Sequence, residues 1–504
     1  MEFTKEWMLR CQDHPVCSST RLSASLPKRI LDISAPDGTV VLRETQAEKG
    51  SYATLSYRWG NGVPLRTTHS TIAQHYGGIP LESFPKTLRD AIIFAKELGF
   101  YFIWIDALCI IQGDSLDWQE QSAAMTAIYQ GCLLNIAIAT APNCDCGIMQ
   151  DINCHRMDHS EWLSSIWSTH TFSALETRGW VFQETLVSVA SVYVTDAGLV
   201  WDCCSAMCCQ NWKPYITTGA TESNKMSSKT PKATWADQSL VSRPDPTAAK
   251  TLSALRVWYE WVALFSRRYL SKASDKLPAI AGLASRLRDA SAATYVARLW
   301  KEDIHIGLSW LGRESESLKR LQNGTPSWSW ASVEGDLEFP SYLSVYCGHS
   351  GRVFVGEGLD MDILTVSAKE VHPGTFGTVV SGCIEAVATM QKGIIDGSTG
   401  RLEFKFDLTK SLSVRYRLDE LQDRSDGPRP CWLLRVASII PQLLGRLYRE
   451  ADRLVMFLIV EETGNKTDEF RRIGGAHGSY EYSGNIGLQT DIFKNGERKV
   501  ITLV

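Results

Sequence analysis

The segment YFIWIDALC, residues 101–109, gives the clearest indication of the fold. It opens with five consecutive apolar residues that stop at Asp106, and such a run predicts a strand covered on both of its faces. Residues 52–57 and residues 133–139 predict two further strands on either side of it along the chain. The three segments are the candidate core of one sheet.

Helical patterns fill the two intervals between these strands. Residues 88–98 repeat apolar side chains at helical spacing, with Ser83 as the expected N-cap and Gly99 just past the end. A second helix is expected to begin at Asp117, where Glu120 would complete a capping box. Strand, helix, strand, helix, strand is the βαβαβ pattern of a parallel, doubly wound sheet, so the fold class is α/β.

The 504 residues are long for a single core and predict two or three domains. After the third strand, a short helix and a hairpin are expected up to about residue 209. The remaining pattern is helical and then β-rich, in one or two domains. The predicted boundaries are an N-terminal arm at 1–40, an α/β domain at 41–212, a linker at 213–250 and a C-terminal region at 251–504.

Composition excludes several classes of protein. Lys and Arg number 52 against 56 Asp and Glu, so no basic footprint for nucleic acid is expected. No stretch approaches the roughly 18 apolar residues of a membrane span, and the first residues lack the pattern of a secretory signal. The 14 cysteines are therefore expected to be reduced thiols in a cytoplasmic protein.

Three sequence blocks carry a family resemblance: residues 52–60, residues 98–112 with their continuation to Ile148, and residues 178–184. In this order and spacing they resemble the fungal heterokaryon incompatibility (HET) domain. The resemblance implies non-self recognition that leads to growth arrest or programmed cell death. Its implied partners are other incompatibility proteins or further copies of the chain. HET domains are also remotely similar to TIR domains, some of which cleave NAD, so NAD is an implied substrate and no cofactor is otherwise expected.

Ligands of open α/β sheets bind at the carboxyl ends of the strands. The first block ends there with Arg58, Trp59 and Gly60, and the second continues from Asp106 to residues 109 and 112. A nucleotide pocket is predicted at this edge, with its ligand-binding residues Arg58, Trp59, Gly60, Cys109 and Gln112. In the alternative interpretation, Asp106 caps local amides and Trp59 covers the sheet edge.

Catalysis, if present, would need a carboxylate, because glycosidic cleavage passes through an oxocarbenium-like state. Glu120 and Asp106 are the predicted catalytic pair. The competing interpretation of Glu120 is the capping box. Cys109 is also a candidate nucleophile, although a thiol directly after a buried strand is more often a packing residue.

The third block is predicted to be an interaction motif on a short helix, formed by Arg178, Trp180, Gln183 and Glu184. Trp180 has core packing as its alternative role. No metal is expected. The cysteine cluster at 203–209 leaves open a zinc site in which Cys204 and Cys208 join Cys144 and Cys146, but adjacent cysteines in a strand point to opposite faces.

Three functions remain open at this level. The first is an effector of the incompatibility type, with nucleotide cleavage as one mechanism. The second is a non-catalytic module for protein interaction and oligomerisation. The third is a metabolic enzyme that reuses the fold. The chain has no phosphate-cradling Gly-rich loop that ends in Lys-Ser or Lys-Thr, which argues against a built-in NTPase.

Overall fold

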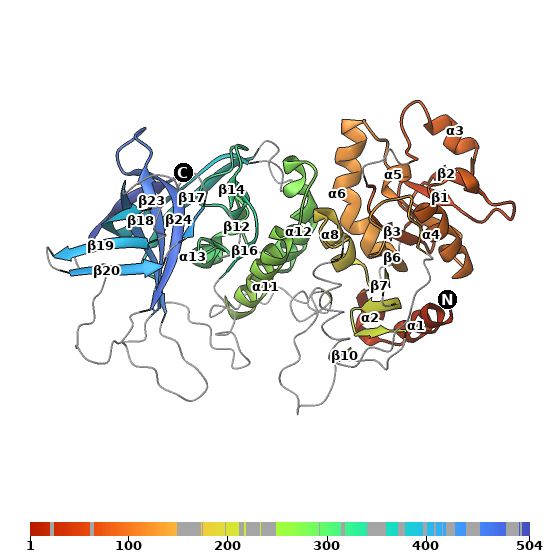
Figure 1. The fold of residues 1–504 in the computed structure, drawn as a ribbon, viewed down its shortest axis with the longest axis horizontal. Helices are drawn as coiled ribbons and strands as arrows, with labels where there is room; N and C mark the ends of the chain where they lie inside the picture. Colours follow the sequence, from red (N-terminus) through yellow and green to blue (C-terminus); the bar gives the residue numbers. More distant parts are fainter. Residues whose placement is uncertain are drawn as a thin grey trace. The chain divides into compact units, whose positions relative to one another are not determined.

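The computed structural model of the chain is shown in Figure 1. It describes residues 1–20, 25–60, 65–148, 173, 175–196, 198–210, 216–217, 232, 248–291, 293–313, 318–339, 359–370, 379–396, 401–407, 410–415, 417–419, 429–439, 454–479, 493 and 496–504. Most of the expected linker at 213–250 lies outside these residues. The chain divides into two compact units, residues 1–239 with 268–283 and residues 240–267 with 284–504.

The N-terminal unit is built on one sheet with the strand order β10-β9-β8-β7-β6-β3-β5-β1-β2-β4. Its strands are β1 (Arg29–Asp32), β2 (Thr39–Glu44), β3 (Ala53–Ser56), β4 (Ile79–Pro80), β5 (Phe102–Trp104), β6 (Leu134–Ile138), β7 (Ala190–Thr195), β8 (Gly198–Cys203), β9 (Ala206–Cys209) and β10 (Ile216–Thr217). Its helices are α1 (Glu2–Gln12), α2 (Pro15–Thr20), α3 (Ile72–Gly77), the 3-10 turn η1 (Leu81–Ser83), α4 (Lys86–Glu97), α5 (Asp106–Cys109), α6 (Ser115–Gly131), α8 (Gly179–Val187) and the 3-10 turn η2 (Ala273–Lys276).

The centre of this sheet is parallel. Strand β3 pairs in parallel with both β5 and β6, and β6 pairs in parallel with β7. All three predicted strands form, and their parallel arrangement is confirmed. The outer pairings of β1 with β5 and of β7 with β8 are antiparallel, so the sheet as a whole is mixed.

The expected N-terminal arm is instead part of the fold. Residues 2–12 and 15–20 form α1 and α2, and β1 is an internal strand between β5 and β2. Few periodic positions mark residues 1–40 because β1 has only four residues, too few for a pattern to stand out.

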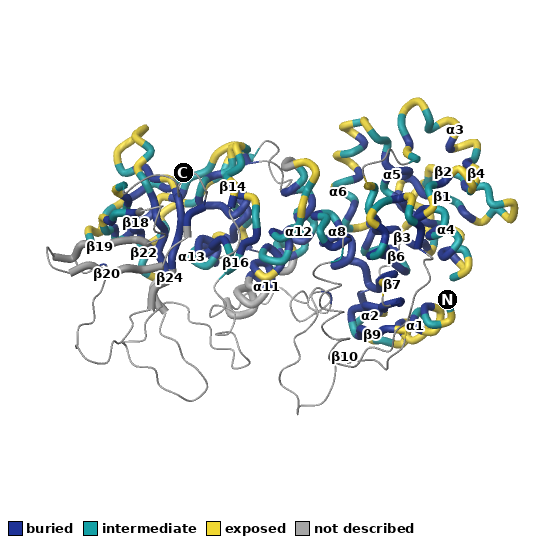
Figure 2. Tube along the Cα trace, viewed as in Figure 1, coloured by how far each residue is buried: buried dark blue, intermediate teal, exposed yellow. Residues whose placement is uncertain are grey.

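Two helices connect the parallel strands and lie on opposite sides of β3 and β6 (Figure 1). Helix α4 has Leu88, Ala91, Ile92 and Ala95 fully buried, as the helical spacing predicts. Figure 2 shows that the strands between these helices are buried along their length.

Helix α6 starts earlier than predicted. Its N-cap is Asp114, whose carboxylate accepts the N–H groups of Leu116 and Asp117 at 2.9 and 3.1 Å. The predicted capping box of Asp117 with Glu120 is therefore wrong. The carboxylate of Asp117 is unavailable for capping because it pairs with the guanidinium of Arg29.

The C-terminal unit is β-rich, with a sheet of order β20-β19-β18-β22-β23-β24-β21 to which β17 and β25 also pair. Its strands are β11 (Tyr295–Val296), β12 (Leu299–Trp300), β13 (Leu311–Gly312), β14 (Lys319–Arg320), β15 (Val333–Glu334), β16 (Leu337–Glu338), β17 (Asp362–Glu370), β18 (Val379–Asp396), β19 (Arg401–Asp407), β20 (Lys410–Arg415), β21 (Arg417–Leu418), β22 (Arg429–Ile439), β23 (Leu454–Glu462), β24 (Glu469–Ser479) and β25 (Glu497–Leu503). Its helical elements are α11 (Ala248–Ser266), the second part of α12 (Pro278–Ser291), η3 (Lys301–Asp303), α13 (Ile304–Gly307) and η4 (Trp330–Ser332).

A fully buried arginine stabilises this second unit. The Nε of Arg472 donates to Asp419 at 2.9 Å, and its terminal nitrogens donate to the carbonyls of Leu308 and Trp310. Its guanidinium also stacks 3.4 Å from the ring centre of Trp310. The charge is thus paired and hydrogen-bonded, as a buried arginine requires.

No helix among the described residues is long and apolar enough to cross a bilayer.

Candidate functional site

The carboxyl ends of β3 and β5 bring two predicted site residues together. Trp59 lies just beyond β3, and Asp106 follows β5 as the first residue of α5. The indole N–H of Trp59 donates to the two carboxylate oxygens of Asp106 at 3.0 and 3.2 Å. The backbone N–H of Ala107 adds a third hydrogen bond of 2.7 Å. The expected adjacency of Trp59 and Asp106 is therefore observed, and it follows from the parallel pairing of β3 with β5.

The carboxyl of Asp106 is partly buried and short of positive charge. Burial raises its pKa above the ordinary value, while the nearby Arg178 and the donors on Ala107 and Trp59 lower it. Burial is the larger effect. The three hydrogen bonds hold the carboxylate in place without fully compensating the loss of water.

Helix α8 places a second carboxyl against the same strand end. Glu184 is only 4% exposed, and its Oε2 accepts a hydrogen bond of 2.5 Å from the hydroxyl of Ser56, the last residue of β3. Burial raises the pKa of Glu184 to about 7, against the lowering effects of Arg178 and Ser56. The negative charge of Asp106 raises it further. Glu184 can therefore both donate and accept a proton near neutral pH.

Arg178 is the cation that these two carboxyls share. It is the residue before α8, and its guanidinium donates to the backbone carbonyl of Tyr57. Its positive charge lowers the pKa values of both Asp106 and Glu184. The buried hydroxyl of Tyr57 lies in the same field, where burial and the charge of Asp106 raise its pKa. Two acids, one cation and a tyrosine thus form the site.

Two of the predicted ligand-binding residues, Gly60 and Gln112, have structural roles. Gly60 has a positive φ of 77°, and a side chain there would overlap Asn143. The amide of Gln112 donates to the carbonyls of Asp106 and Ile110, both at 3.2 Å, and so supports the loop after β5.

Cys109 is fully buried, and burial raises the pKa of its thiol to about 12. This burial fits the packing interpretation of Cys109. Arg58 is half-buried at the same strand end as Trp59.

Glu120 does not join Asp106. Its side chain is 56% exposed and pairs with Lys28 at 2.6 Å. The predicted catalytic pair is therefore not assembled, and the carboxyl that approaches Asp106 electrostatically is Glu184. A signal for Glu184 exists in the sequence, because it is the one charged residue of α8 (GWVFQETLV) and most of that helix is buried. The sequence pattern instead predicts that Glu184 belongs to an interaction motif.

The interaction motif itself is largely internal. Gln183 is buried and bonds to the Thr126 hydroxyl at 2.8 Å, and Glu184 bonds to Ser56. Both side chains therefore bond within the unit. Trp180 is half-buried, packs edge-on against Trp118 with ring centres 6.3 Å apart, and donates to Asp275 at 3.4 Å.

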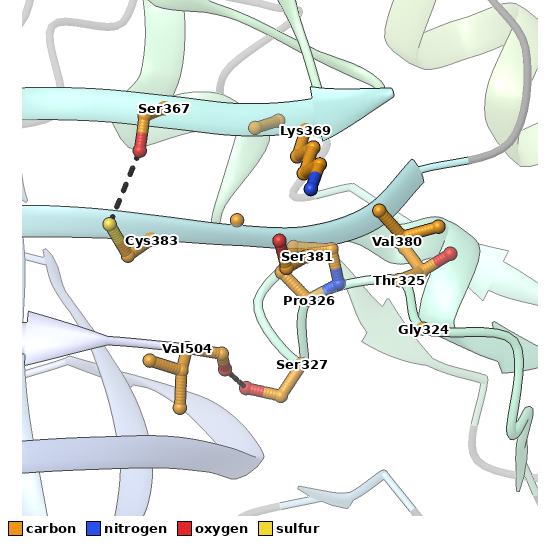
Figure 3. A pocket seen from close by; sticks show the side chains of 12 residues that line it. Gly324, Thr325, Pro326, Ser327, Ser367, Lys369, Val380, Ser381, Cys383 and Val504 are labelled. Carbon is orange, nitrogen blue, oxygen red and sulfur yellow. Dashed lines mark hydrogen bonds between the residues drawn. The ribbon is translucent and has the colours of Figure 1, made fainter. Parts of the chain in front are cut away.

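A separate cavity of about 590 Å³ lies in the C-terminal unit (Figure 3). Residues 324–327, 367–369 and 380–383 line it together with Val504. Its lining is mostly backbone and small side chains, and Lys369 is its one charged lining residue. The thiol of Cys383 and the hydroxyl of Ser367 lie 3.2 Å apart on its wall. This cavity lacks the paired acids of the N-terminal unit and is the weaker candidate for chemistry.

These features define an α/β domain with a partly parallel sheet and a buried acid pair at the carboxyl ends of its strands. Residues 52–184 match the family model described as Heterokaryon incompatibility protein (HET), and this match confirms the resemblance that the three sequence blocks indicate. The match runs from the residue before β3 to Glu184 and so includes Ser56, Trp59, Asp106 and Arg178. No curated protein and no solved structure matches the chain.

Proposed function

We propose that this protein acts in heterokaryon incompatibility, as an intracellular effector whose HET domain hydrolyses the nicotinamide–ribose bond of NAD. The family match supports the cellular role. The carboxyl pair of Asp106 and Glu184, which shares the charge of Arg178 at the carboxyl ends of parallel strands, is the observation that carries the chemistry. A growth arrest or cell death response would follow from loss of the dinucleotide.

The sheet also supports a TIR-like, doubly wound arrangement. The parallel strands have the order β5-β3-β6-β7, in which the chain starts at β3, moves to one neighbour and then crosses to the other. Such a reversal leaves a crevice at the carboxyl ends of the strands, where nucleotides bind in sheets of this type. Asp106 and Trp59 lie at those ends.

The two acids would have different roles in the hydrolysis. Asp106, held by the donors on Trp59 and Ala107, is positioned to stabilise the positive charge that develops on the ribose as nicotinamide leaves. Glu184, with a pKa of about 7, can accept the proton of the attacking water. The products are nicotinamide, ADP-ribose and one proton. Trp59 and Arg58 would contact the ring system and the phosphates.

The test is to incubate the purified full chain with NAD and to follow nicotinamide release by chromatography. We expect turnover in the wild type and a loss of at least about 100-fold in both Asp106→Asn and Glu184→Gln. Glu120→Gln is the matched control, since this exposed glutamate pairs with Lys28 and should retain full activity.

Absence of nicotinamide release from the wild type, concentrated or oligomerised, would overturn the catalytic proposal. The HET domain would then be an interaction module that binds other incompatibility proteins or further copies of itself. Release of a different product from a panel of nucleotides would favour a metabolic enzyme on the same fold.

A further inference from the structure

Three cysteines and one histidine from distant parts of the chain converge at one end of β8. Cys11 lies in the last turn of α1, His14 between α1 and α2, Cys17 in α2, and Cys203 is the last residue of β8. Their ligand atoms, three Sγ and one imidazole nitrogen, all lie within 4.8 Å of one another. Among the described residues, these four side chains form a group that could bind a metal ion.

Two of the spacings match edges of a tetrahedral site. The Nδ1 of His14 lies 3.7 Å from the Sγ of Cys17 and 3.5 Å from the Sγ of Cys203. Zinc binds thiolate at about 2.3 Å and imidazole at about 2.0 Å, which makes the S···N edge of a tetrahedral site about 3.6 Å. The two observed distances lie on either side of that value. His14, Cys17 and Cys203 thus have the spacing of ligands of one ion, and Cys11 lies within 4.8 Å of each of them.

Local structure explains why the first three residues share one side. The spacing Cys11-x-x-His14-x-x-Cys17 crosses the break between α1, which ends at Gln12, and α2, which begins at Pro15. The chain turns there, with the N–H of His14 donating to the carbonyl of Cys11. The turn presents His14 between the two cysteines, and β8 supplies the fourth residue.

Packing or a disulfide accounts less well for this arrangement. The three thiols are reduced and at most 1% exposed. Hydrogen bonds of the thiols of Cys17 and Cys203 to the imidazole nitrogen would use two of the sulfurs, but they do not explain why Cys11 lies within 4.8 Å of the same atoms. A disulfide would use two of the sulfurs and leave the third thiol beside the histidine, whereas a metal ion uses all four groups.

We propose that Cys11, His14, Cys17 and Cys203 form a structural zinc site. Thiolate and imidazole ligands in tetrahedral arrangement favour zinc over harder cations, and four protein ligands leave no open position for a substrate. The ion would join α1 and α2 to the end of the sheet that holds β8, with which α1 is in contact. All four residues lie outside the matched region 52–184, so this site is independent of the proposed NAD chemistry.

The sequence indicated no metal and, as the alternative, a zinc set of Cys204, Cys208, Cys144 and Cys146. The group in the structure differs from that set in every residue. Because residues 1–40 are interpreted as an arm, Cys11, His14 and Cys17 are not among the metal ligands considered from the sequence. Of the clustered cysteines at 203–209, the geometry selects Cys203.

The test is the metal content of the full chain, produced with zinc and dialysed under reducing conditions, by plasma mass spectrometry. We expect about one zinc per chain in the wild type and below about a tenth in the Cys11→Ser/Cys17→Ser variant. Cys146→Ser is the matched control, because this half-buried cysteine lies outside the proposed site and hydrogen-bonds to Asn143. This variant should keep the full zinc content. His14→Cys should also keep zinc, whereas His14→Ala should lose it.

A second measurement does not depend on whether a variant folds. Wild-type protein loaded with Co²⁺ should show intense visible absorption from tetrahedral cobalt and near-ultraviolet thiolate-to-cobalt bands. Wild type that contains no zinc and gives no tetrahedral cobalt spectrum would overturn the proposal. So would a disulfide between any two of Cys11, Cys17 and Cys203 in the reduced preparation, detected by peptide mapping.

Discussion

Two buried acidic centres in the N-terminal unit differ in how their charge is compensated. In the first, Asp117 has an arginine to itself: Arg29 Nη2 lies 2.6 Å from its Oδ1, and the backbone N–H of Ile111 lies 2.8 Å from its Oδ2. The Nε of Arg29 donates to the Cys109 carbonyl at 2.8 Å, and Lys28 Nζ lies 3.9 Å from Asp117 Oδ1. Because each member of the pair has further polar partners, we call this pair saturated. This centre connects β1, the loop after β5 and α6.

In the second centre, Asp106 and Glu184 share one arginine. Arg178 donates to the Tyr57 carbonyl, and the pKa values of both acids remain raised by burial. Buried charge alone therefore does not mark a functional site in this protein. A saturated pair stabilises the fold, whereas acids that lack full compensation can exchange protons and are candidates for chemistry.

The largest effect is expected from breaking the saturated centre. Arg29→Met removes the buried cation of Asp117 and leaves only the half-exposed Lys28 at 3.9 Å, which should lower the free energy of unfolding by about 3 to 5 kcal/mol. The measurement is urea-dependent hydrogen exchange of amides in α6. Lys28→Met is the comparison variant, because Lys28 is 40% exposed, lies 2.6 Å from Glu120 and only 3.9 Å from Asp117, and should contribute less than about 1 kcal/mol. Equal losses in the two variants would remove the distinction.

A pH-dependent effect of intermediate size is expected from Glu184→Gln. The unfolded glutamate titrates near 4.5 and the folded one at about 7, so its contribution to stability is complete below pH 4.5 and declines as pH rises to about 7. The decline should amount to about 3 kcal/mol. The glutamine variant should lack it, and chemical denaturation at several pH values measures the difference. Parallel pH profiles for the two proteins would contradict an uncompensated Glu184.

The smallest effect is expected from Trp59→Phe, which removes the N–H donor but keeps an aromatic ring. Loss of a hydrogen bond to a carboxylate should cost about 1.5 kcal/mol and raise the pKa of Asp106 further. Carboxyl carbon chemical shifts, followed during a pH titration, report that pKa. Trp118→Phe is a control, since its ring packs edge-on against Trp180 and should leave the Asp106 titration unchanged.

The sequence predicted best what is local or carried by a family block. Apolar spacing identified the strands at 52–57, 101–105 and 133–139 and the buried side of α4. Parallel topology then followed, and with it the contact between Trp59 and Asp106. Capping was the local feature that failed, because Asp117 is taken by Arg29, 88 residues away in the chain.

Side-chain periodicity and short motifs are properties of neighbouring residues, so the sequence alone indicated the α/β plan, the resemblance to the HET domain and the edge of the sheet where the proposed site lies. Which charges are compensated depends on the folded chain. Ser56 meets Glu184 across 128 residues, and His14 meets Cys203 across 189. Such partners are chosen by packing, and the burial that raises a pKa or gathers thiols exists only once the chain has folded around them.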